Sequence, residues 1–191
     1  MPTKKPEFYP RIVLTNDITD IDMSGTTHPG LDYLRAAIID IENVMTDGID
    51  GYDPTIRPEV MVWMDKFLSS GRKFSLLTNC TDVDFVGDVA AQINCEFGKQ
   101  MTLLPTQSKL HASPYRIACS IMGVAPSFTM LIDDQFKSYR GARKAGIGVM
   151  NWTRPYGNHQ HSVVRRLRPF EMGLVRPFVA KLPKTLVFET S

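Results

Sequence analysis

The chain alternates short apolar runs with amphipathic segments, which is the pattern of a parallel β-sheet covered by helices. Four apolar runs are predicted as buried strands because each is short and nearly continuous. They occupy residues 36–40, 73–79, 128–132 and 147–151. No internal repeat is evident. The pattern therefore predicts an α/β fold with a single Rossmann-like parallel sheet and helices on both faces.

The segments between these runs have apolar residues at helical spacing, which predicts helices that pack on the sheet. The first begins near Pro58, a residue suited to the first turn of a helix. The others span 82–94, 109–122 and 137–145. The residues predicted to face the sheet are Val60, Trp63, Met64, Phe67 and Leu68 in the first helix, Val83, Val86, Ala90 and Ile93 in the second, and Ile117, Ile121 and Met122 in the third.

Polar side chains stand where three of the predicted strands end. Asp40 ends the first run, Thr78 and Asn79 end the second, and Asp133 with Asp134 follows the third. In an open parallel sheet, ligands bind beyond the carboxyl ends of the strands. The helices that follow offer amide groups that favour an anion such as phosphate. These residues are therefore expected to form one site at one edge of the sheet.

The first strand leads into Asp40-Ile41-Glu42, a pair of carboxylates two residues apart. If the backbone stays extended, both side chains point the same way. One carboxylate could then attack a phosphorus centre while the other exchanges a proton with the leaving group. A strand that ends in an acid is also common without such a role, so this pair gains weight only from the other residues.

Two further residues suit the handling of a phosphoryl group. Thr78 offers a hydroxyl beside backbone amides that could hold a phosphoryl oxygen, with a simple strand-end turn as the alternative. Lys109 stands at the predicted start of a helix, where the helix dipole disfavours a cation. A nearby anion would explain this position, and the ammonium could neutralise both a nucleophile and a phosphate. A solvent-exposed lysine is the alternative.

The pair Asp133-Asp134 ends an apolar strand and suits Mg²⁺. This ion binds through one or two carboxylates, water and phosphate oxygens. Because adjacent side chains point to opposite sides of a strand, at most one of the two is expected to be a direct ligand. Asp134 is the preferred one.

In this order and spacing the motifs resemble those of the haloacid dehalogenase (HAD) superfamily of phosphohydrolases. The closer resemblance is to its small capless phosphatases, those related to phosphatidylglycerophosphate phosphatase. It covers roughly residues 18–151. The matching stretches are Ile18-Thr19-Asp20-Ile21-Asp22, Ile39-Asp40-Ile41-Glu42-Asn43-Val44, Leu77-Thr78-Asn79, Lys109, Met122-Gly123-Val124-Ala125-Pro126, Asp134-Gln135 and Ala145-Gly146-Ile147.

The resemblance implies an Mg²⁺-dependent phosphomonoester hydrolase. Asp40 would be the nucleophile that forms an aspartyl-phosphate, and Glu42 would be the general acid and base. Thr78, Asn79 and Lys109 would bind the phosphoryl group, and water would hydrolyse the intermediate. The metal ligands would be Asp40, Glu42 through its backbone carbonyl, and Asp134.

Two positions depart from the pattern of the family. An aspartate is usual where this chain has Glu42, and a displacement of about 1 Å in a catalytic group can cost about 10²-fold in rate. A second acid is common four residues beyond the metal aspartate, where this chain has Ser138. Asp133 stands where the family usually has glycine, and it could supply the carboxylate that is missing at position 138. The alternative function is therefore a catalytically degenerate HAD-fold protein used for binding or assembly.

A receiver domain of the response-regulator type would share the aspartate and the metal. The acid-x-acid pair at the first strand argues against it, as does the absence of an obvious receiver phosphoacceptor pattern.

The spacing leaves room for little or no cap domain. Only 14 residues separate Glu42 from Arg57, and 30 separate Thr78 from Lys109. An uncapped site would accept phosphate on a large or accessible molecule, such as a phospholipid, a phosphoprotein or a nucleic-acid end.

Charge divides the chain unevenly. From position 151 onward there are seven Lys/Arg and two Asp/Glu, against 15 and 18 in the first 150 residues. We expect an N-terminal extension at 1–17, a HAD-like catalytic domain at 18–151, and a basic segment at 152–191 that packs on or extends the domain. The basic segment could meet an anionic lipid or a nucleic acid, with a solvated basic face as the alternative.

The three cysteines lack the spacing of a disulfide framework or a zinc site. No apolar run approaches the ~20 residues of a membrane span, and no signal-peptide pattern follows the N-terminus. A cytoplasmic protein is expected, with contact to a membrane surface left open.

Overall fold

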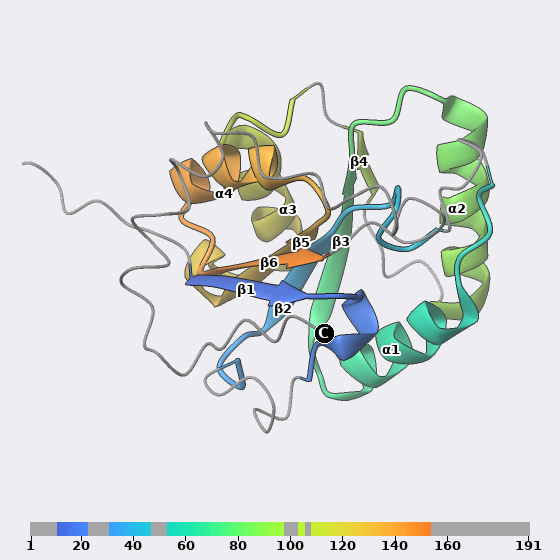
Figure 1. Cartoon of the computed structure of the whole chain (residues 1–191), viewed down its shortest axis with the longest axis horizontal. Helices are drawn as coiled ribbons and strands as arrows, with labels where there is room; N and C mark the ends of the chain where they lie inside the picture. Colours follow the sequence, from blue (N-terminus) through green and yellow to red (C-terminus); the bar gives the residue numbers. More distant parts are fainter. Residues whose placement is uncertain (1–10, 23–30, 47–52, 98–102, 106–107, 154–191) are drawn as a thin grey trace, which may run out of the picture.

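Six parallel strands form one sheet in the part of the chain that the structure describes (Figure 1). The computed structural model describes residues 11–22, 31–46, 53–97, 103–105 and 108–153. The strands lie in the spatial order β1-β6-β5-β2-β3-β4. Their bounds are β1 Arg11–Thr15, β2 Ala36–Ile39, β3 Lys73–Thr78, β4 Leu103–Pro105, β5 Thr129–Asp133 and β6 Val149–Thr153.

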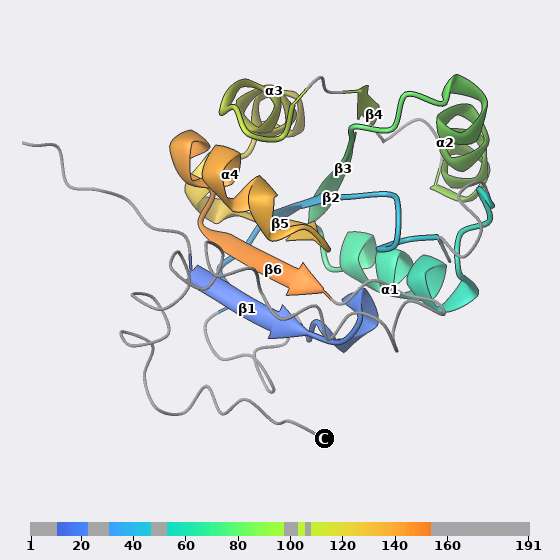
Figure 2. The same ribbon diagram turned by 45° about the horizontal axis from the view of Figure 1, so that its top comes forward.

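Helices cover both faces of the sheet, as the sequence pattern predicts (Figure 2). Helices α1 and α2 pack on one face, and α3 and α4 pack on the other. Three single-turn 3₁₀ helices join the strands and helices. The helix bounds are α1 Pro58–Ser69, α2 Val83–Phe97, α3 Ser113–Met122 and α4 Tyr139–Ala145, and the 3₁₀ turns are η1 Ile18–Asp20, η2 Pro126–Phe128 and η3 Phe136–Ser138.

Strand β2 shows how a continuous apolar run builds two cores. All four of its residues are buried. Ala36 and Ile38 belong to the core under α3 and α4, whereas Ala37 and Ile39 belong to the core under α1 and α2. Successive side chains of a strand point to opposite faces, so both faces of a strand in the middle of a two-sided sheet favour apolar residues.

Helix α2 turns a different face to the sheet from the predicted one. It buries Phe85, Val89 and Ile93, of which Ile93 was predicted to be inward. The predicted Val86 packs partly buried against the same core, whereas Val83 is 82% exposed. Residues two apart lie on different sides of a helix, so α2 cannot bury both Phe85 and Val83. The larger apolar area of the phenyl ring decides the orientation.

Helix α3 is also rotated relative to the prediction. Ile117 and Ile121 are 49% and 52% exposed, while Tyr115 and Met122 are buried. The Tyr115 hydroxyl donates to the Lys109 carbonyl at 2.8 Å. This buried hydrogen bond fixes the Tyr115 side of α3 against the sheet, and the two isoleucines then lie outside. The buried face predicted for α1 is confirmed, with Leu68 partly buried beside it.

The outermost strand β1 comes from the region that the sequence pattern assigned to an N-terminal extension. It pairs in parallel with β6, in the register Arg11↔Val149 to Thr15↔Thr153. As an edge strand it has only two fully buried residues, Ile12 and Val13. Such a short apolar pair gives a weak strand pattern.

At the other end, β6 continues to Thr153. The rest of the basic segment, 154–191, lies outside the described residues. None of the described helices has the length and apolar character needed to cross a bilayer.

Two valine substitutions in α2 test the helix orientation. Val89→Ala removes a fully buried side chain and should lower the free energy of unfolding by about 1–2 kcal/mol. Val83→Ala, on the exposed side of the same helix, should change it by less than about 0.5 kcal/mol. Urea unfolding of the two variants measures the difference. Equal losses, or a larger loss at Val83, would show that the helix faces the sheet as the sequence pattern predicted.

Candidate active site

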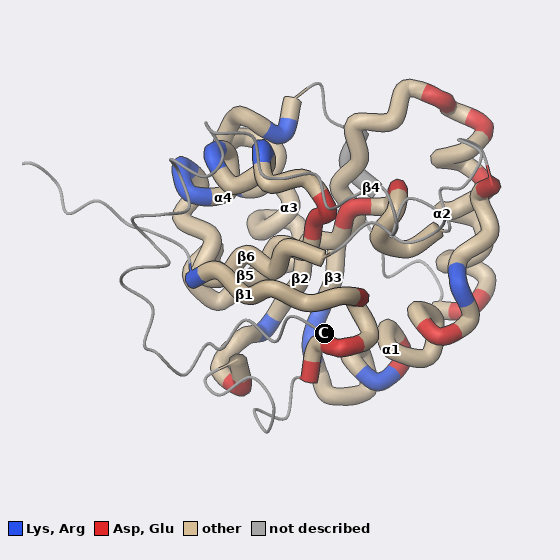
Figure 3. The backbone as a smooth tube through the Cα atoms, in the orientation of Figure 1, with Lys and Arg blue, Asp and Glu red and all other residues tan. Residues whose placement is uncertain are grey.

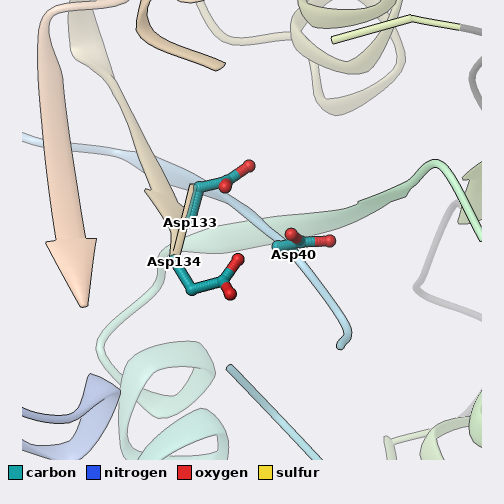
Figure 4. A group of neighbouring side chains, drawn as sticks. All are labelled: Asp40, Asp133 and Asp134. Atoms are coloured by element: carbon teal, nitrogen blue, oxygen red, sulfur yellow. The ribbon is translucent and has the colours of Figure 1, made fainter. Parts of the chain in front are cut away.

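The acidic residues that end the predicted strands come together in the structure. Asp40 follows β2 directly, and its N–H still donates to the Ile132 carbonyl of β5 at 2.9 Å. Asp133 is the last residue of β5, and Asp134 follows it. Because β2 and β5 are neighbours in the sheet, the three carboxylates cluster where these strands end (Figure 4).

Lys109 contacts two of the three carboxylates. Its ammonium lies 2.5 Å from Asp40 Oδ2 and donates a hydrogen bond to Asp133 Oδ2 at 3.1 Å. All three side chains are almost fully buried. The predicted anionic partner of Lys109 is therefore present. The predicted helix start is wrong, because Lys109 lies in a turn and α3 begins only at Ser113.

Three buried carboxylates thus share one ammonium. Burial alone would lower the pKa of Lys109, but the charges of Asp133 and Asp40 outweigh it and hold the pKa above its usual value. Burial raises the pKa of Asp40 well above its usual range, the charge of Asp133 adds to the rise, and Lys109 opposes it. One ammonium cannot compensate three carboxylates in a low-dielectric site.

The pKa of Asp134 is raised as well. Burial, and then the charge of Asp133, raises its pKa to about 7. The amide of Asn43 donates to Asp134 Oδ2 through a long hydrogen bond of 3.5 Å. Without a bound cation, Asp134 would therefore gain or lose its proton near neutral pH.

The donor set fits a hard divalent cation. Asp40, Asp133 and Asp134 each offer a carboxylate oxygen, and these atoms lie within 4.8 Å of one another. Asp134 Oδ1 is buried and accepts no hydrogen bond from any described residue, and the partner of Asp40 Oδ2 is the Lys109 ammonium. Buried oxygens without donors are rare unless they have another partner, and Mg²⁺ prefers carboxylate ligands of this kind.

Asp133 lies in the cluster together with its neighbour, although at most one of the two acids was expected there as a ligand. Its two oxygens already have protein donors: Gln135 N–H donates to Oδ1 at 2.7 Å and Lys109 donates to Oδ2. The free oxygen at this strand end is therefore on Asp134. The contacts favour Asp134 as the metal ligand and Asp133 as the residue that orients Lys109.

The other predicted residues lie around this centre. Thr78 is buried at the end of β3, and its Oγ1 accepts a hydrogen bond from Cys80 N–H at 2.9 Å, which forms the strand-end turn. Asn79 has a buried Oδ1 without a donor among the described residues. Glu42 lies half-buried in the turn after Asp40, and its carboxylate is not part of the three-acid cluster.

Asn43 and Trp152 hold Asp134 in place, and neither role was predicted. Asn43 has a φ of 59°, a left-handed conformation that asparagine tolerates better than most residues. This turn brings its amide to the Asp134 carboxylate. Trp152 Nε1–H donates to the Asp134 backbone carbonyl at 2.7 Å. An asparagine just after the acid pair was a readable signal, but no sequence signal links Trp152 to Asp134.

Arg57 ties down the loop that follows Asp40. Its Nη2 donates to the Val44 carbonyl at 2.7 Å, and its backbone N–H donates to the Met45 carbonyl at 3.1 Å. Its Nη1 also pairs with Asp17 at 2.7 Å. The loop is thereby fixed to both α1 and the turn after β1, which restricts the position of Glu42.

A close approach of α4 supports the turn that contains Lys109. A Cβ atom added to Gly141 would lie 2.2 Å from the Lys109 carbonyl oxygen and 2.7 Å from that of His111. Only glycine allows this contact. Tyr115 donates to the same Lys109 carbonyl, so the turn is held from α3 and from α4.

Solved structures match the chain at low sequence identity, whereas no protein-family model and no curated protein matches it. One match is the cobalt-bound deoxy-D-mannose-octulosonate 8-phosphate phosphatase from Haemophilus influenzae, 13% identical over 76% of this chain and 90% of that one, with a TM-score of 0.50. Another is a predicted HAD-like family hydrolase from Porphyromonas gingivalis, 12% identical over 71% and 98%, also with a TM-score of 0.50.

This chain has the HAD-like fold. The fold predicted from the resemblance of the motifs is therefore confirmed. A HAD-like sheet places residues from the ends of β2, β3 and β5 at one edge, which is where the three-acid cluster lies.

A pair of glycine substitutions tests the support of Lys109. Gly141→Ala should lower the free energy of unfolding by about 1–3 kcal/mol or more, because the added methyl overlaps two backbone oxygens. Gly87→Ala in α2 is the control, since a Cβ there meets nothing within 4 Å. It should raise the free energy of unfolding by roughly 0.5–1 kcal/mol. Urea unfolding separates the two, and a stabilising Gly141→Ala would refute the close contact.

Removing one charge from the cluster should stabilise the metal-free protein. The pKa of Asp134 is about 7 in the folded chain, against about 3.9 unfolded. Its contribution to stability is therefore fully present below pH ~4 and lost as the pH rises through about 7. Asp134→Asn should raise the melting temperature in EDTA more at pH 8 than at pH 5.

Thermal melts of Asp134→Asn and of Asp88→Asn, an exposed position on α2, provide the comparison. The control should show no pH-dependent gain. A gain at Asp134 that is the same at both pH values would contradict the raised pKa.

Proposed function

We propose that this chain is an Mg²⁺-dependent phosphomonoester hydrolase that works through an aspartyl-phosphate on Asp40. The observation that supports this most directly is the buried Asp40–Lys109 pair beside Asp134, at the end of a central strand of a HAD-like sheet. A carboxylate paired with a fixed ammonium is held in place to attack, and the ammonium meets the negative charge of an incoming phosphate.

The contacts of Asp40 suit a nucleophile. Ile41 N–H donates to its Oδ1 at 2.9 Å, which fixes the plane of the carboxylate. Oδ2 accepts no hydrogen bond of good geometry from the described residues, although the Lys109 ammonium lies beside it. The carboxylate therefore has a fixed direction, and its charge is paired with a buried ammonium.

The reaction proceeds in two displacements. A carboxylate oxygen of Asp40 forms a bond to phosphorus, the bond from phosphorus to the alcohol oxygen breaks, and Glu42 gives that oxygen a proton. A water molecule then attacks the phosphorus of the aspartyl-phosphate and loses a proton to Glu42. The Asp40 carboxylate and inorganic phosphate are released. Thr78, Asn79 and Lys109 bind the phosphoryl oxygens during both steps.

Asp40, Asp134 and the backbone carbonyl of Glu42 would hold Mg²⁺. The ion supplies positive charge that offsets the charge on the phosphoryl oxygens. Two features of the chain support this assignment: the buried Asp134 Oδ1, which accepts no hydrogen bond from a described residue, and the raised pKa values of Asp40 and Asp134. The phosphatase from Haemophilus influenzae, which shares the fold, was solved with bound cobalt.

The departure at Ser138 matters less than the motif comparison implies. Ser138 is fully buried, and its backbone carbonyl lies 3.2 Å from the Tyr115 hydroxyl. Asp133 already supplies a carboxylate to Lys109, so the cluster has three acids without a contribution from position 138. This arrangement supports catalysis over the degenerate alternative.

Glu42 is the feature that favours the alternative, a catalytically degenerate HAD-fold protein used for binding or assembly. Its carboxylate lies outside the three-acid cluster. Arg57 fixes the backbone of the loop that contains Glu42. The Glu42 carboxylate can therefore approach the leaving group only by a change of side-chain rotamer. A protein with an intact Asp40–Lys109 pair and a misplaced general acid would bind phosphate and turn it over slowly.

A substrate with its phosphate on a large or accessible molecule fits the proposed site. The connection from β2 to α1 is closed early by the antiparallel bridge Thr46↔Ile56, and β3 leads into α2 after only a short turn. Neither connection has room for a cap domain. We propose a phospholipid, a phosphoprotein or a nucleic-acid end as the substrate, acted on in the cytoplasm.

Phosphate release from p-nitrophenyl phosphate tests the proposed function. With Mg²⁺, Asp40→Asn should lose activity by at least about 10³-fold, because the amide cannot serve as the nucleophile. Asp88→Asn, a change of the same chemistry on exposed α2, should keep the wild-type rate. EDTA should abolish the activity of the wild type and of the control.

Circular dichroism and thermal melts would establish that Asp40→Asn is folded. Equal rates in Asp40→Asn and the wild type would refute the role of Asp40. No release by a folded wild type, from this substrate or from a panel of lipid, nucleotide and nucleic-acid phosphomonoesters, would favour the degenerate binding protein.

A further inference from the structure

The two faces of the sheet have opposite charge. The α1–α2 side, residues 53–97, contains seven Asp/Glu and four Lys/Arg. The α3–α4 side, residues 108–153, contains six Lys/Arg and two acids, Asp133 and Asp134, both of which belong to the active site. Figure 3 shows this division, with acidic positions along α2 and basic positions along α4. Apart from Asp133 and Asp134, every charged Asp, Glu, Lys or Arg residue in the segment 108–153 is therefore basic.

Three of these cations form a row, defined here as the α4 row: Lys137, Arg140 and Lys144. All three are exposed. Residues spaced three and four apart share one side of a helix, and the opposite side of α4 is buried in the core. The α4 row is therefore a line of positive charge on the outside of the molecule.

The α4 row begins at the active site. Lys137 lies in η3, three positions after Asp134 and just beyond the end of β5. From there the row continues into α4, where Arg140 and Lys144 lie about 6 Å apart along the helix axis, at a rise of ~1.5 Å per residue. Arg116 of α3 lies beside its far end, because its guanidinium donates to the Lys144 carbonyl at 2.9 Å. A line of cations thus leads from the site along the outer surface.

We propose that the α4 row binds the phosphodiester backbone of a single-stranded nucleic acid whose terminal phosphate enters the Asp40 site. Exposed Lys and Arg side chains neutralise successive phosphates of such a strand and release its counterions. Hydrolysis of the terminal phosphate depends on the proposed phosphatase function, whereas binding of the strand to the α4 row does not.

The placement of the row favours a nucleic acid over a membrane surface. Helix α4, to which Arg140 and Lys144 of the row belong, covers one face of the sheet (Figure 2). The acidic cluster lies at the strand ends (Figure 4). A bilayer against α4 would keep its headgroup phosphates in one plane, away from the strand ends. A flexible strand can follow the row and turn into the site at Lys137.

The composition of α4 supports the same choice. Helices that lie in a membrane interface insert apolar side chains between the lipids. The exposed side chains of α4 are basic, and none of its described residues is an exposed large apolar one. The helix thus offers charge for a phosphate chain without an apolar surface for lipid tails.

Fluorescence anisotropy of a labelled single-stranded oligonucleotide tests this inference in the full chain with Asp40→Asn, so that no turnover occurs. In that background the triple variant Lys137→Gln, Arg140→Gln, Lys144→Gln should bind about tenfold or more weakly at moderate salt. The slope of log K against log salt should become shallower by about two, at ~0.7 per lost phosphate contact. Lys66→Gln, an exposed lysine on α1, should leave affinity and slope unchanged.

Kinetics with the catalytic chain give a second readout. For an oligonucleotide with a terminal phosphate at either end, the triple variant should lower kcat/KM relative to that for p-nitrophenyl phosphate by about tenfold. Single Lys144→Gln, remote from Asp40 along the row, should show a smaller loss of the same kind. It also keeps the test valid if the triple variant does not fold.

Equal oligonucleotide affinity and salt slope in the triple variant and its parent would overturn the inference. So would binding to vesicles of anionic phospholipid that depends on the row, in the absence of oligonucleotide binding. If no phosphomonoester is hydrolysed by any variant, the proposed function fails, but the anisotropy measurement still decides whether the row binds a strand.

Discussion

The burial of three carboxylates around a single ammonium is the constraint on which the site depends. Asp40, Asp133 and Asp134 meet where two neighbouring strands end, and Lys109 is the one cation that the described residues bring into contact with Asp40 and Asp133. Charges buried without full compensation cost folding free energy. The cluster is therefore stable only if a proton, a divalent cation or both reduce its negative charge. The same imbalance of charge would favour binding of the proposed Mg²⁺ ion.

The rest of the structure holds this unfavourable group in place. The parallel sheet fixes Asp40 through its N–H bond to the Ile132 carbonyl of β5, and it fixes Asp133 through the pairing of β5 with β6. Tyr115 and the close approach at Gly141 fix the turn that contains Lys109. These contacts lie outside the chemistry, yet they set the distances on which it depends, since misplacement by about 1 Å can cost about 10²-fold in rate.

Sequence patterns predicted the position of the site residues that lie at the ends of strands. The carboxylates could be assigned to one edge because parallel strands end on the same side of a sheet, and this required no knowledge of packing. Helix faces were harder: in α2 the stripe through Val83 and the stripe through Phe85 both fit a helical period, and only packing chose between them. The contacts of Trp152 and Gly141 join segments far apart in the chain and leave no local pattern.

Trapping of the covalent intermediate tests the central claim most directly. A phosphomonoester would be mixed with the Mg²⁺-loaded chain, the reaction quenched in acid within the first turnover, and the peptides analysed by mass spectrometry. The account predicts a phosphoryl group on the peptide that contains Asp40, lost on treatment with hydroxylamine as expected of an acyl phosphate. Turnover without a phosphorylated peptide, or with the phosphoryl group on another residue, would contradict it.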